Sequence, residues 1–109
     1  MSRLIKSIKL TGLNEKVWLA LKLIPKGKVT TYKMIAKFIG QPKTARAVGS
    51  ACGKNLDAPE VPCHRVVKSD GALGGYSGGV KKKIELLKKE GIKVINNRVE
   101  DFQKKIFKF

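Results

Sequence analysis

The sequence predicts a mainly α-helical domain with short strands, built around a helix-turn-helix. Apolar residues recur at helical spacing in several short segments. Two of these segments are joined by only Gln41, Pro42 and Lys43, and so tight a link is typical of a helix-turn-helix. The 109 residues suit one domain and leave no room for two independent cores. We therefore expect residues 1–109 to form a single domain.

The N-terminal quarter predicts one short strand and one helix. Residues 3–10 weakly favour a strand. Asn14 is a plausible N-cap for a helix that runs to Ile24, where Pro25 ends it. The apolar side chains of this helix fall on one face, so we expect that face to pack inward.

The next two segments predict the helix-turn-helix pair. The first helix covers residues 31–40, with a threonine at its start as cap and Gly40 at its end. The second covers residues 44–52, and Arg46 is its only long side chain. Helices that read bases in the major groove usually carry several long polar side chains. This helix is therefore expected to bind DNA without much sequence preference; the alternative is that its small residues only permit close packing.

The second half of the chain predicts shorter elements separated by glycine-rich turns. In order, they are a loop at 53–62, an extended pair at 66–67, a turn at 69–71, a glycine-rich loop at 74–79, a helix at 80–90 that stops at Gly91, a strand at 92–95 and an amphipathic helix at 98–109. Together with the first half, they predict helices as the main component and strands of only a few residues.

The charge balance favours a polyanionic partner. Lysine and arginine total 24 against 8 acidic residues, which gives a net charge of +16 at pH 7. On so small a surface this produces a positive field that attracts nucleic acid. The alternative is a lysine-rich surface that is merely solvated. A membrane partner is not expected, because no segment combines a long apolar face with a basic one.

The cysteine count and the N-terminal sequence predict the compartment. Two cysteines exclude a disulfide-dense secreted scaffold. Lysines interrupt the first twelve residues, so they lack the continuous apolar stretch of a signal peptide. No apolar run approaches the ~18–20 residues that span a bilayer. We expect a cytoplasmic protein that associates with the nucleoid through DNA.

Cys63 is the strongest candidate for covalent chemistry. It follows Pro62 and lies beside His64 and within two residues of Arg65. A thiol near cationic groups loses its proton more easily, and the thiolate is the nucleophile. The alternative is a buried structural cysteine.

His64 is the only histidine, so any imidazole base must be this residue. Neighbours in an extended segment point to opposite sides, so a water bridge from Cys63 to His64 is more plausible than a direct hydrogen bond. Orienting the imidazole needs a third group, for which Glu90 is one candidate among eight acidic residues.

No metal or organic cofactor is expected. Cys52, Cys63 and His64 supply only three ligands, and sequence neighbours rarely point at one ion. A disulfide between the two cysteines is unfavoured in a reducing compartment, and we expect Cys52 to serve packing. Neither glycine-rich phosphate motif, GxGxxG or GxxxxGK[ST], is present.

Three motifs carry a family resemblance: PCHRVV at 62–67, GYSGG at 75–79 and ARAVGSA at 45–51. With the segments VWLAL and IPKGKVTTY they resemble the O6-alkylguanine-DNA alkyltransferases, or methylated-DNA–protein-cysteine methyltransferases, over about residues 11–93. The resemblance implies the winged-helix-like helix-turn-helix fold of their C-terminal domain. It also implies a suicide enzyme that flips O6-alkylguanine out of double-stranded DNA and moves the alkyl group irreversibly to its own cysteine. Members usually carry a further N-terminal domain, whereas this chain begins near the DNA-binding domain.

The resemblance also implies roles for individual residues. Cys63 resembles the alkyl acceptor, His64 the base that acts through a water, and Glu90 the group that orients the imidazole. Tyr32 resembles the phenol that hydrogen-bonds the guanine leaving group. Asn55 resembles the residue that holds the turn before the active-site segment.

Two further sets of residues follow from the same motifs. Arg46 resembles the finger that enters the duplex in place of the flipped base. Its DNA-binding neighbours are Thr44, Ala45, Ala47, Gly49 and Ser50. The expected pocket wall consists of Val66, Tyr76, Ser77 and Gly78.

Two alternative functions remain at this point. Alkyltransferase-like damage sensors share the fold but lack the acceptor cysteine, so Cys63 argues against that class. A helix-turn-helix transcription regulator would show sequence preference and would dimerise. The bare helix at 44–52 argues against a regulator, and we expect a monomer.

Overall fold

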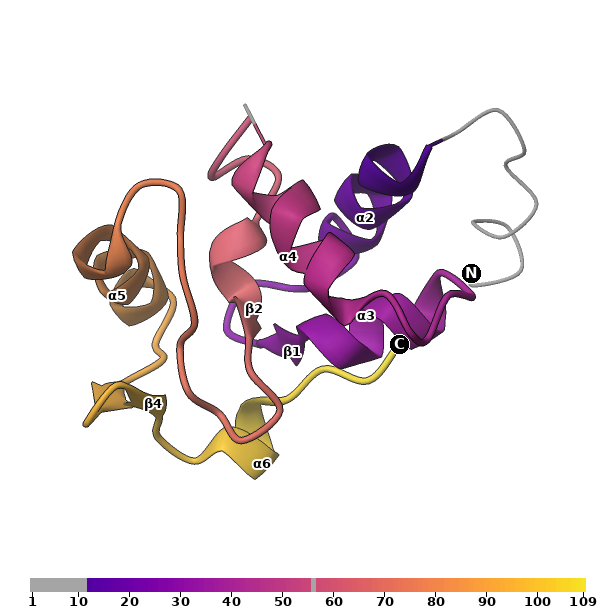
Figure 1. The fold of residues 1–109 in the computed structure, drawn as a ribbon. Coiled ribbons are helices and arrows are strands. Elements are labelled where there is room, and N and C mark those ends of the chain that lie inside the picture. Colours follow the sequence, from indigo (N-terminus) through magenta and orange to yellow (C-terminus); the bar gives the residue numbers. More distant parts are fainter. Residues whose placement is uncertain (1–11, 56) are drawn as a thin grey trace.

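The computed structural model describes residues 12–55 and 57–109, so the strand expected at 3–10 lies outside the described part (Figure 1). The fold is mainly helical with strands of two residues, which confirms the predicted fold class. The helices are α2 (Leu13–Leu21), α3 (Tyr32–Phe38), α4 (Ala45–Gly53), α5 (Val80–Lys89) and α6 (Phe102–Lys105), with a 3₁₀ turn η1 (Cys63–Arg65). The strands are β1 (Thr30–Thr31), β2 (Val66–Val67), β3 (Val94–Ile95) and β4 (Arg98–Val99).

Helices α2, α3 and α4 form one cluster around an apolar core (Figure 1). Val17 from α2, Ile35 from α3 and Val48 from α4 are each fully buried there. The Trp18 indole Nε1 donates a hydrogen bond to the Ala51 carbonyl at 2.9 Å, which ties α2 to α4. The connection between α3 and α4 spans only six residues, which confirms the expected helix-turn-helix.

The predicted caps of α3 are present, whereas the predicted N-cap of α2 is not. Thr31 caps α3 as expected, because its hydroxyl oxygen accepts from the Met34 amide at 3.1 Å. Gly40 follows α3 with φ +84°, the left-handed conformation that suits glycine. The expected Asn14 cap is wrong: Gly12 holds the N-cap position of α2, and its carbonyl accepts from the Lys16 amide at 3.1 Å.

Two parallel strands join the two halves of the chain. Thr30 in β1 pairs with Val66 in β2, and Thr31 pairs with Val67. Because β1 leads directly into α3 and β2 follows η1 directly, this pairing brings Tyr32 and Cys63 into one region. A second apolar core consists of Val29, Val67, Leu73, Leu87, Ile92 and Val99.

The helix expected at 98–109 is wrong over most of its length. Arg98 and Val99 instead pair with β3 through a turn in which Asn96 and Asn97 have φ of 51° and 63°. Consecutive positive φ angles are those of a type I′ hairpin turn, which asparagine tolerates. Only α6 is helical, and the tail beyond it returns to β1, where the Phe107 amide donates to the Val29 carbonyl at 2.6 Å.

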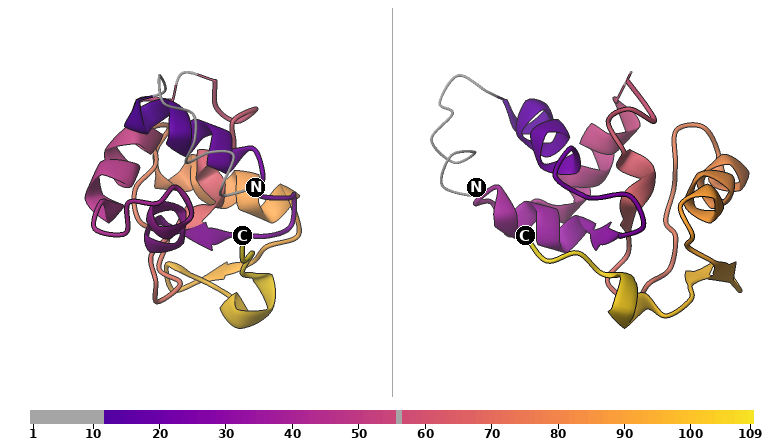
Figure 2. Two further views of the ribbon diagram at one scale, coloured as in Figure 1. Left: turned by 90° about the vertical axis from the view of Figure 1, so that its right-hand side faces the viewer. Right: turned by 180° about the vertical axis from the view of Figure 1, so that it is seen from behind.

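The C-terminal segment runs past β1 and ends beside α3 (Figure 2). There the Phe109 ring stacks on Phe38 with centroids 4.3 Å apart. Within the described residues, no helix has the length and apolar character needed to cross a membrane.

Candidate active site

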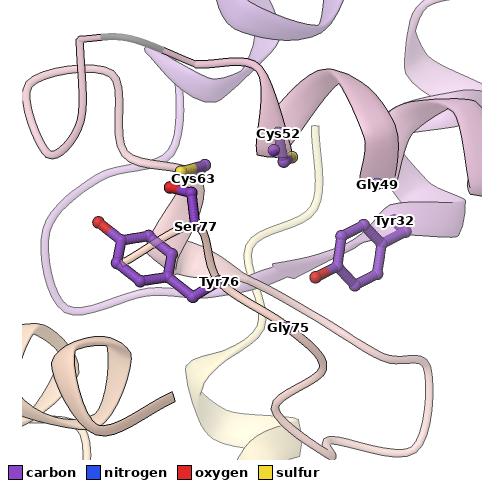
Figure 3. A pocket seen from close by; sticks show the side chains of 8 residues that line it. Tyr32, Gly49, Cys52, Cys63, Gly75, Tyr76 and Ser77 are labelled. Carbon is purple, nitrogen blue, oxygen red and sulfur yellow. The ribbon is translucent and has the colours of Figure 1, made fainter. Parts of the chain in front are cut away.

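A pocket of about 360 Å³ opens between α3, α4, η1 and the glycine-rich loop (Figure 3). In Figure 3, Tyr32 lies on one side of the pocket, and Tyr76 and Ser77 lie on the other. Cys63 forms part of the wall and is only 3% exposed. The full lining consists of Tyr32, Gly49, Cys52, Gly53, Cys63, Gly75, Tyr76 and Ser77.

The segment that carries Cys63 is a 3₁₀ turn, so the expected extended conformation is wrong. The Arg65 amide donates to the Pro62 carbonyl at 3.0 Å, which closes the turn. The argument that neighbouring side chains point to opposite sides therefore does not apply to Cys63 and His64. Their placement follows instead from the contacts that each side chain makes.

His64 is buried and its two ring nitrogens differ in environment. Nε2 lies 2.9 Å from Oε2 of Glu90, whereas Nδ1 is buried and has no hydrogen-bond partner among the described residues. Burial lowers the pKa of His64, although the hydrogen bond to Glu90 opposes this shift. The imidazole is therefore neutral near pH 7, with Nε2 donating to Glu90 and Nδ1 left as an acceptor.

Glu90 receives donors from two side chains. Besides His64, Arg65 donates from Nε to Oε1 at 2.9 Å and from Nη2 to Oε2 at 2.7 Å. Burial alone would raise the pKa of Glu90, but the hydrogen bonds from Arg65 and His64 lower it. Glu90 is consequently a fixed carboxylate that holds the orientation of the imidazole.

Sequence reasoning missed the part that Arg65 plays. Its Nη1 also donates to the Ile24 carbonyl at 2.7 Å, so Arg65 joins η1 both to Glu90 and to the turn after α2, which ends at Leu21 and not at Ile24 as expected. The sequence placed Arg65 near Cys63 as a cation. Its pairing with a carboxylate 25 residues away is visible only in the folded chain.

Tyr32 is the first residue of α3 and keeps its proton at neutral pH. Burial, with a smaller contribution from the thiols of Cys52 and Cys63, raises the pKa of Tyr32 to about 12. Its hydroxyl lies against Gly74, where an added Cβ would be 3.0 Å from the oxygen. Tyr32 can therefore donate a hydrogen bond into the pocket.

Asn55 holds the connection that precedes the active-site turn. Its Nδ2 donates to the Val61 carbonyl at 2.7 Å, and its Oδ1 accepts from the Asp57 amide at 3.0 Å. The side chain is buried at 7% exposure. Asn55 thus links the end of α4 to the residues just before Cys63.

The residues expected to bind DNA line two different sites, the pocket and an open groove. Gly49 faces the first pocket, whereas Arg46 lines a separate open groove of about 720 Å³. Arg46 and Ser50 are exposed on α4. Thr44, Ala45 and Ala47 line the same groove as Arg46, together with Lys33, Lys43 and Lys68.

Two of the four residues expected to line the pocket do so. Tyr76 and Ser77 line the pocket, but Val66 and Gly78 do not. Val66 is fully buried in β2, and Gly78 lies behind the Tyr76 ring, where an added Cβ would be 3.0 Å from Cε2. The Val66 carbonyl accepts a hydrogen bond from Lys83, a second residue that sequence reasoning missed.

Cys52 and Cys63 are both free thiols. Burial, together with the nearby Cys63 thiol, raises the pKa of Cys52 to about 12, so this thiol is protonated at neutral pH. Within the described residues, no group of three or more His, Cys, Asp or Glu side chains could hold a metal ion.

Several known proteins are similar to this chain. The family model described as "6-O-methylguanine DNA methyltransferase, DNA binding domain" matches residues 12–92. The regulatory protein ada of Salmonella typhimurium is 51% identical over 83 residues, which are 76% of this chain and 24% of that protein. A methylated-DNA–protein-cysteine methyltransferase of Methanosarcina acetivorans is 52% identical over 81 residues, 74% of this chain and 52% of the relative.

Two solved structures resemble the fold. OGT of Mycobacterium tuberculosis in complex with DNA has a TM-score of 0.72 at 48% identity, covering 74% of this chain and 49% of that chain. S. pombe Atl1, in complex with damaged DNA containing O6-carboxymethylguanine, has a TM-score of 0.76 at 31% identity, covering 88% of this chain and 94% of that chain. The chain thus spans between a quarter and a half of the curated relatives named above, but nearly all of Atl1.

Proposed function

Because the chain belongs to the 6-O-methylguanine DNA methyltransferase family, we propose that it repairs duplex DNA by moving the methyl group of O6-methylguanine irreversibly to its own Cys63. The observation that carries this proposal is the placement of a buried cysteine in a pocket beside a neutral histidine with one unpartnered nitrogen. The O6 atom of a stacked, paired guanine could not reach this wall. The lesion therefore has to be flipped out of the duplex.

The transfer uses only the thiol and the lesion. His64 Nδ1 accepts the proton of Cys63 through a water, and Glu90 holds the imidazole in the required orientation. The thiolate sulfur then bonds to the methyl carbon while the bond from that carbon to O6 breaks. The electron pair passes into the guanine ring, where a hydrogen bond from the Tyr32 phenol stabilises the leaving base.

The groove beside Arg46 supports the DNA part of the proposal. Arg46 is exposed at the edge of α4, where it can replace the flipped base in the stack. The three lysines that line the same groove suit the phosphates of either strand. We also propose that the protein acts on double-stranded DNA as a monomer in the cytoplasm, at the nucleoid; its net charge of +16 supports the DNA contact.

A second candidate function is damage sensing without transfer. Atl1 favours it, because that chain resembles this fold with a TM-score of 0.76 at 31% identity and was solved in complex with damaged DNA containing O6-carboxymethylguanine. Cys63 favours transfer, because a sensor needs no buried nucleophile at this wall. Both functions predict tight binding to a duplex with the lesion, so only the chemistry separates them.

Mass spectrometry after incubation with a duplex that contains one O6-methylguanine tests the proposal. We expect one methyl group per protein, on the peptide that contains Cys63, and no further gain with excess substrate. Cys63→Ser should bind the duplex and gain nothing. Tight binding of the unmodified protein without any mass gain would establish the damage sensor instead.

A further inference from the structure

Lys83 is a fully buried cation next to the candidate active site, and the proposed chemistry does not use it. Its neighbours Lys81 and Lys82 on α5 are exposed. The Lys83 ammonium group donates to the carbonyls of Val66 at 2.7 Å, Leu73, and Gly75 at 3.1 Å. Three N–H donors therefore meet three acceptors, which is the condition under which a buried charge is tolerated.

The three acceptors belong to two segments that lead to the pocket, β2 and the glycine-rich loop. Val66 follows η1 directly, so its carbonyl fixes the segment that carries Cys63. Gly75 lines the pocket and directly precedes Tyr76, which lines it as well. The ammonium group lies 6.0 Å from the centroid of the Tyr32 ring.

The glycine-rich loop also approaches Tyr32 directly, at Gly74. Leu73 and Gly75, whose carbonyls both bind Lys83, flank this glycine, which has φ +69°. Because a Cβ at Gly74 would be 3.0 Å from the Tyr32 hydroxyl, the backbone lies directly against that oxygen. Any movement of the loop therefore changes the space around the hydroxyl.

We propose that Lys83 is a positioning residue for methyl transfer, whose ammonium group fixes the glycine-rich loop and Tyr32 relative to Cys63. The inference rests on the proposed function. A flipped base then enters a pocket whose walls are already in place, so that the methyl carbon lies in line with the sulfur. Lys83 itself does not contact the reacting atoms and acts through the carbonyls that it binds.

Lys83→Met tests this inference, with Lys82→Met on the same helix as control. We expect the limiting rate of methyl transfer at saturating duplex to fall about a hundredfold, since misplacing a reacting group by ~1 Å costs that much. The dissociation constant for the duplex and the rate at which iodoacetamide modifies Cys63 should change less than about threefold, because neither needs an aligned base. Lys82→Met should match the unmodified protein in all three.

Three other outcomes contradict the inference. If the transfer rate, the affinity for the duplex and the iodoacetamide rate of Lys83→Met all fall by the same factor, Lys83 contributes only to folding. An unchanged transfer rate shows that the loop needs no clamp. Absence of transfer by the unmodified protein contradicts the proposed function, and the inference fails with it.

The unmodified protein supplies a second measurement for the case in which Lys83→Met does not fold. Burial lowers the pKa of Lys83 to about 8, and a neutral amine has one donor too few for three carbonyls. We expect the ratio of the transfer rate to the iodoacetamide rate to fall about threefold or more between pH 7 and 9. A constant ratio would overturn the inference.

Other groups around Lys83 do not produce this change. Burial raises the pKa values of Tyr32 and Cys52 to about 12 and also raises that of Tyr76, whereas burial lowers that of His64. These shifts move all four away from the range between pH 7 and 9. Both rates report on the same Cys63 sulfur, so their ratio isolates the alignment of the base.

Discussion

Gly74 and Gly75 are adjacent in the sequence but have opposite environments. A Cβ at Gly74 would press on the Tyr32 hydroxyl at 3.0 Å, and its φ of +69° disfavours any other residue. A Cβ at Gly75 would meet nothing within 4 Å. Adding a methyl group at Gly74 displaces Tyr32, whereas adding it at Gly75 changes only the composition of the loop. Comparing the two variants therefore isolates the effect of displacing Tyr32.

We predict that Gly74→Ala lowers the transfer rate by about tenfold or more, because it moves the phenol away from the leaving base. Gly75→Ala should remain within about threefold of the unmodified protein. Single-turnover transfer to a labelled duplex measures both. Equal rates for the two variants would mean that the position of Tyr32 does not matter to the reaction.

The sequence predicted Cys63, His64 and Glu90 as a group, and the structure places His64 against Glu90 at 2.9 Å. Their roles in transfer stay predictions. Lys83 is the last of three consecutive lysines, and nothing in the sequence distinguishes it from Lys82. Its burial depends on acceptors 8 to 17 residues away, which only the folded chain brings together.

At the scale of elements, the local signals around α3 were confirmed, whereas the Asn14 cap of α2 was wrong. The Thr31 cap and Gly40 act within one helical turn, and both were predicted correctly. The tail was not, because Val99 pairs in a hairpin and Ile106 bridges to Val29, 77 residues away. Apolar spacing alone could not distinguish a helix from a tail held by such distant partners.

The Thr31 cap predicts a measurable contribution of α3 to stability. Thr31→Ala removes the acceptor for the Met34 amide, so the free energy of unfolding should fall by about 1 kcal/mol. Thr31→Ser keeps the hydroxyl and should retain most of that stability. Urea unfolding followed by circular dichroism measures the difference. An identical loss in both variants would indicate that the methyl group, and not the cap, contributes.

At the scale of the whole molecule, the net charge of +16 acts together with one groove. Arg46 and the three lysines there provide four cations for phosphate contacts. Four contacts give a slope of about −3.6 for the logarithm of affinity against the logarithm of salt concentration. Small side chains dominate the rest of α4, so the affinity for undamaged duplex should depend little on its sequence.

Lys43→Met should reduce the magnitude of that slope by about one, because it removes one phosphate contact. Lys89→Met, outside the groove, is the matched control and should leave the slope unchanged. Fluorescence anisotropy of a labelled duplex, titrated at salt concentrations between about 50 and 200 mM, measures the slope. A slope near zero would remove the groove from the DNA interface.

The return of the C-terminal segment to β1 has a mechanical consequence. Phe109 stacks on Phe38, and the backbone at Lys105 and Phe107 is bonded to both sides of Val29. Val29 directly precedes β1, which leads into Tyr32. A pulling force applied at Phe109 would therefore break the ring stack and then the hydrogen bonds at Val29. It would disturb Tyr32, which lines the pocket, before it disturbed α2. A tether attached at that end strains the active site first.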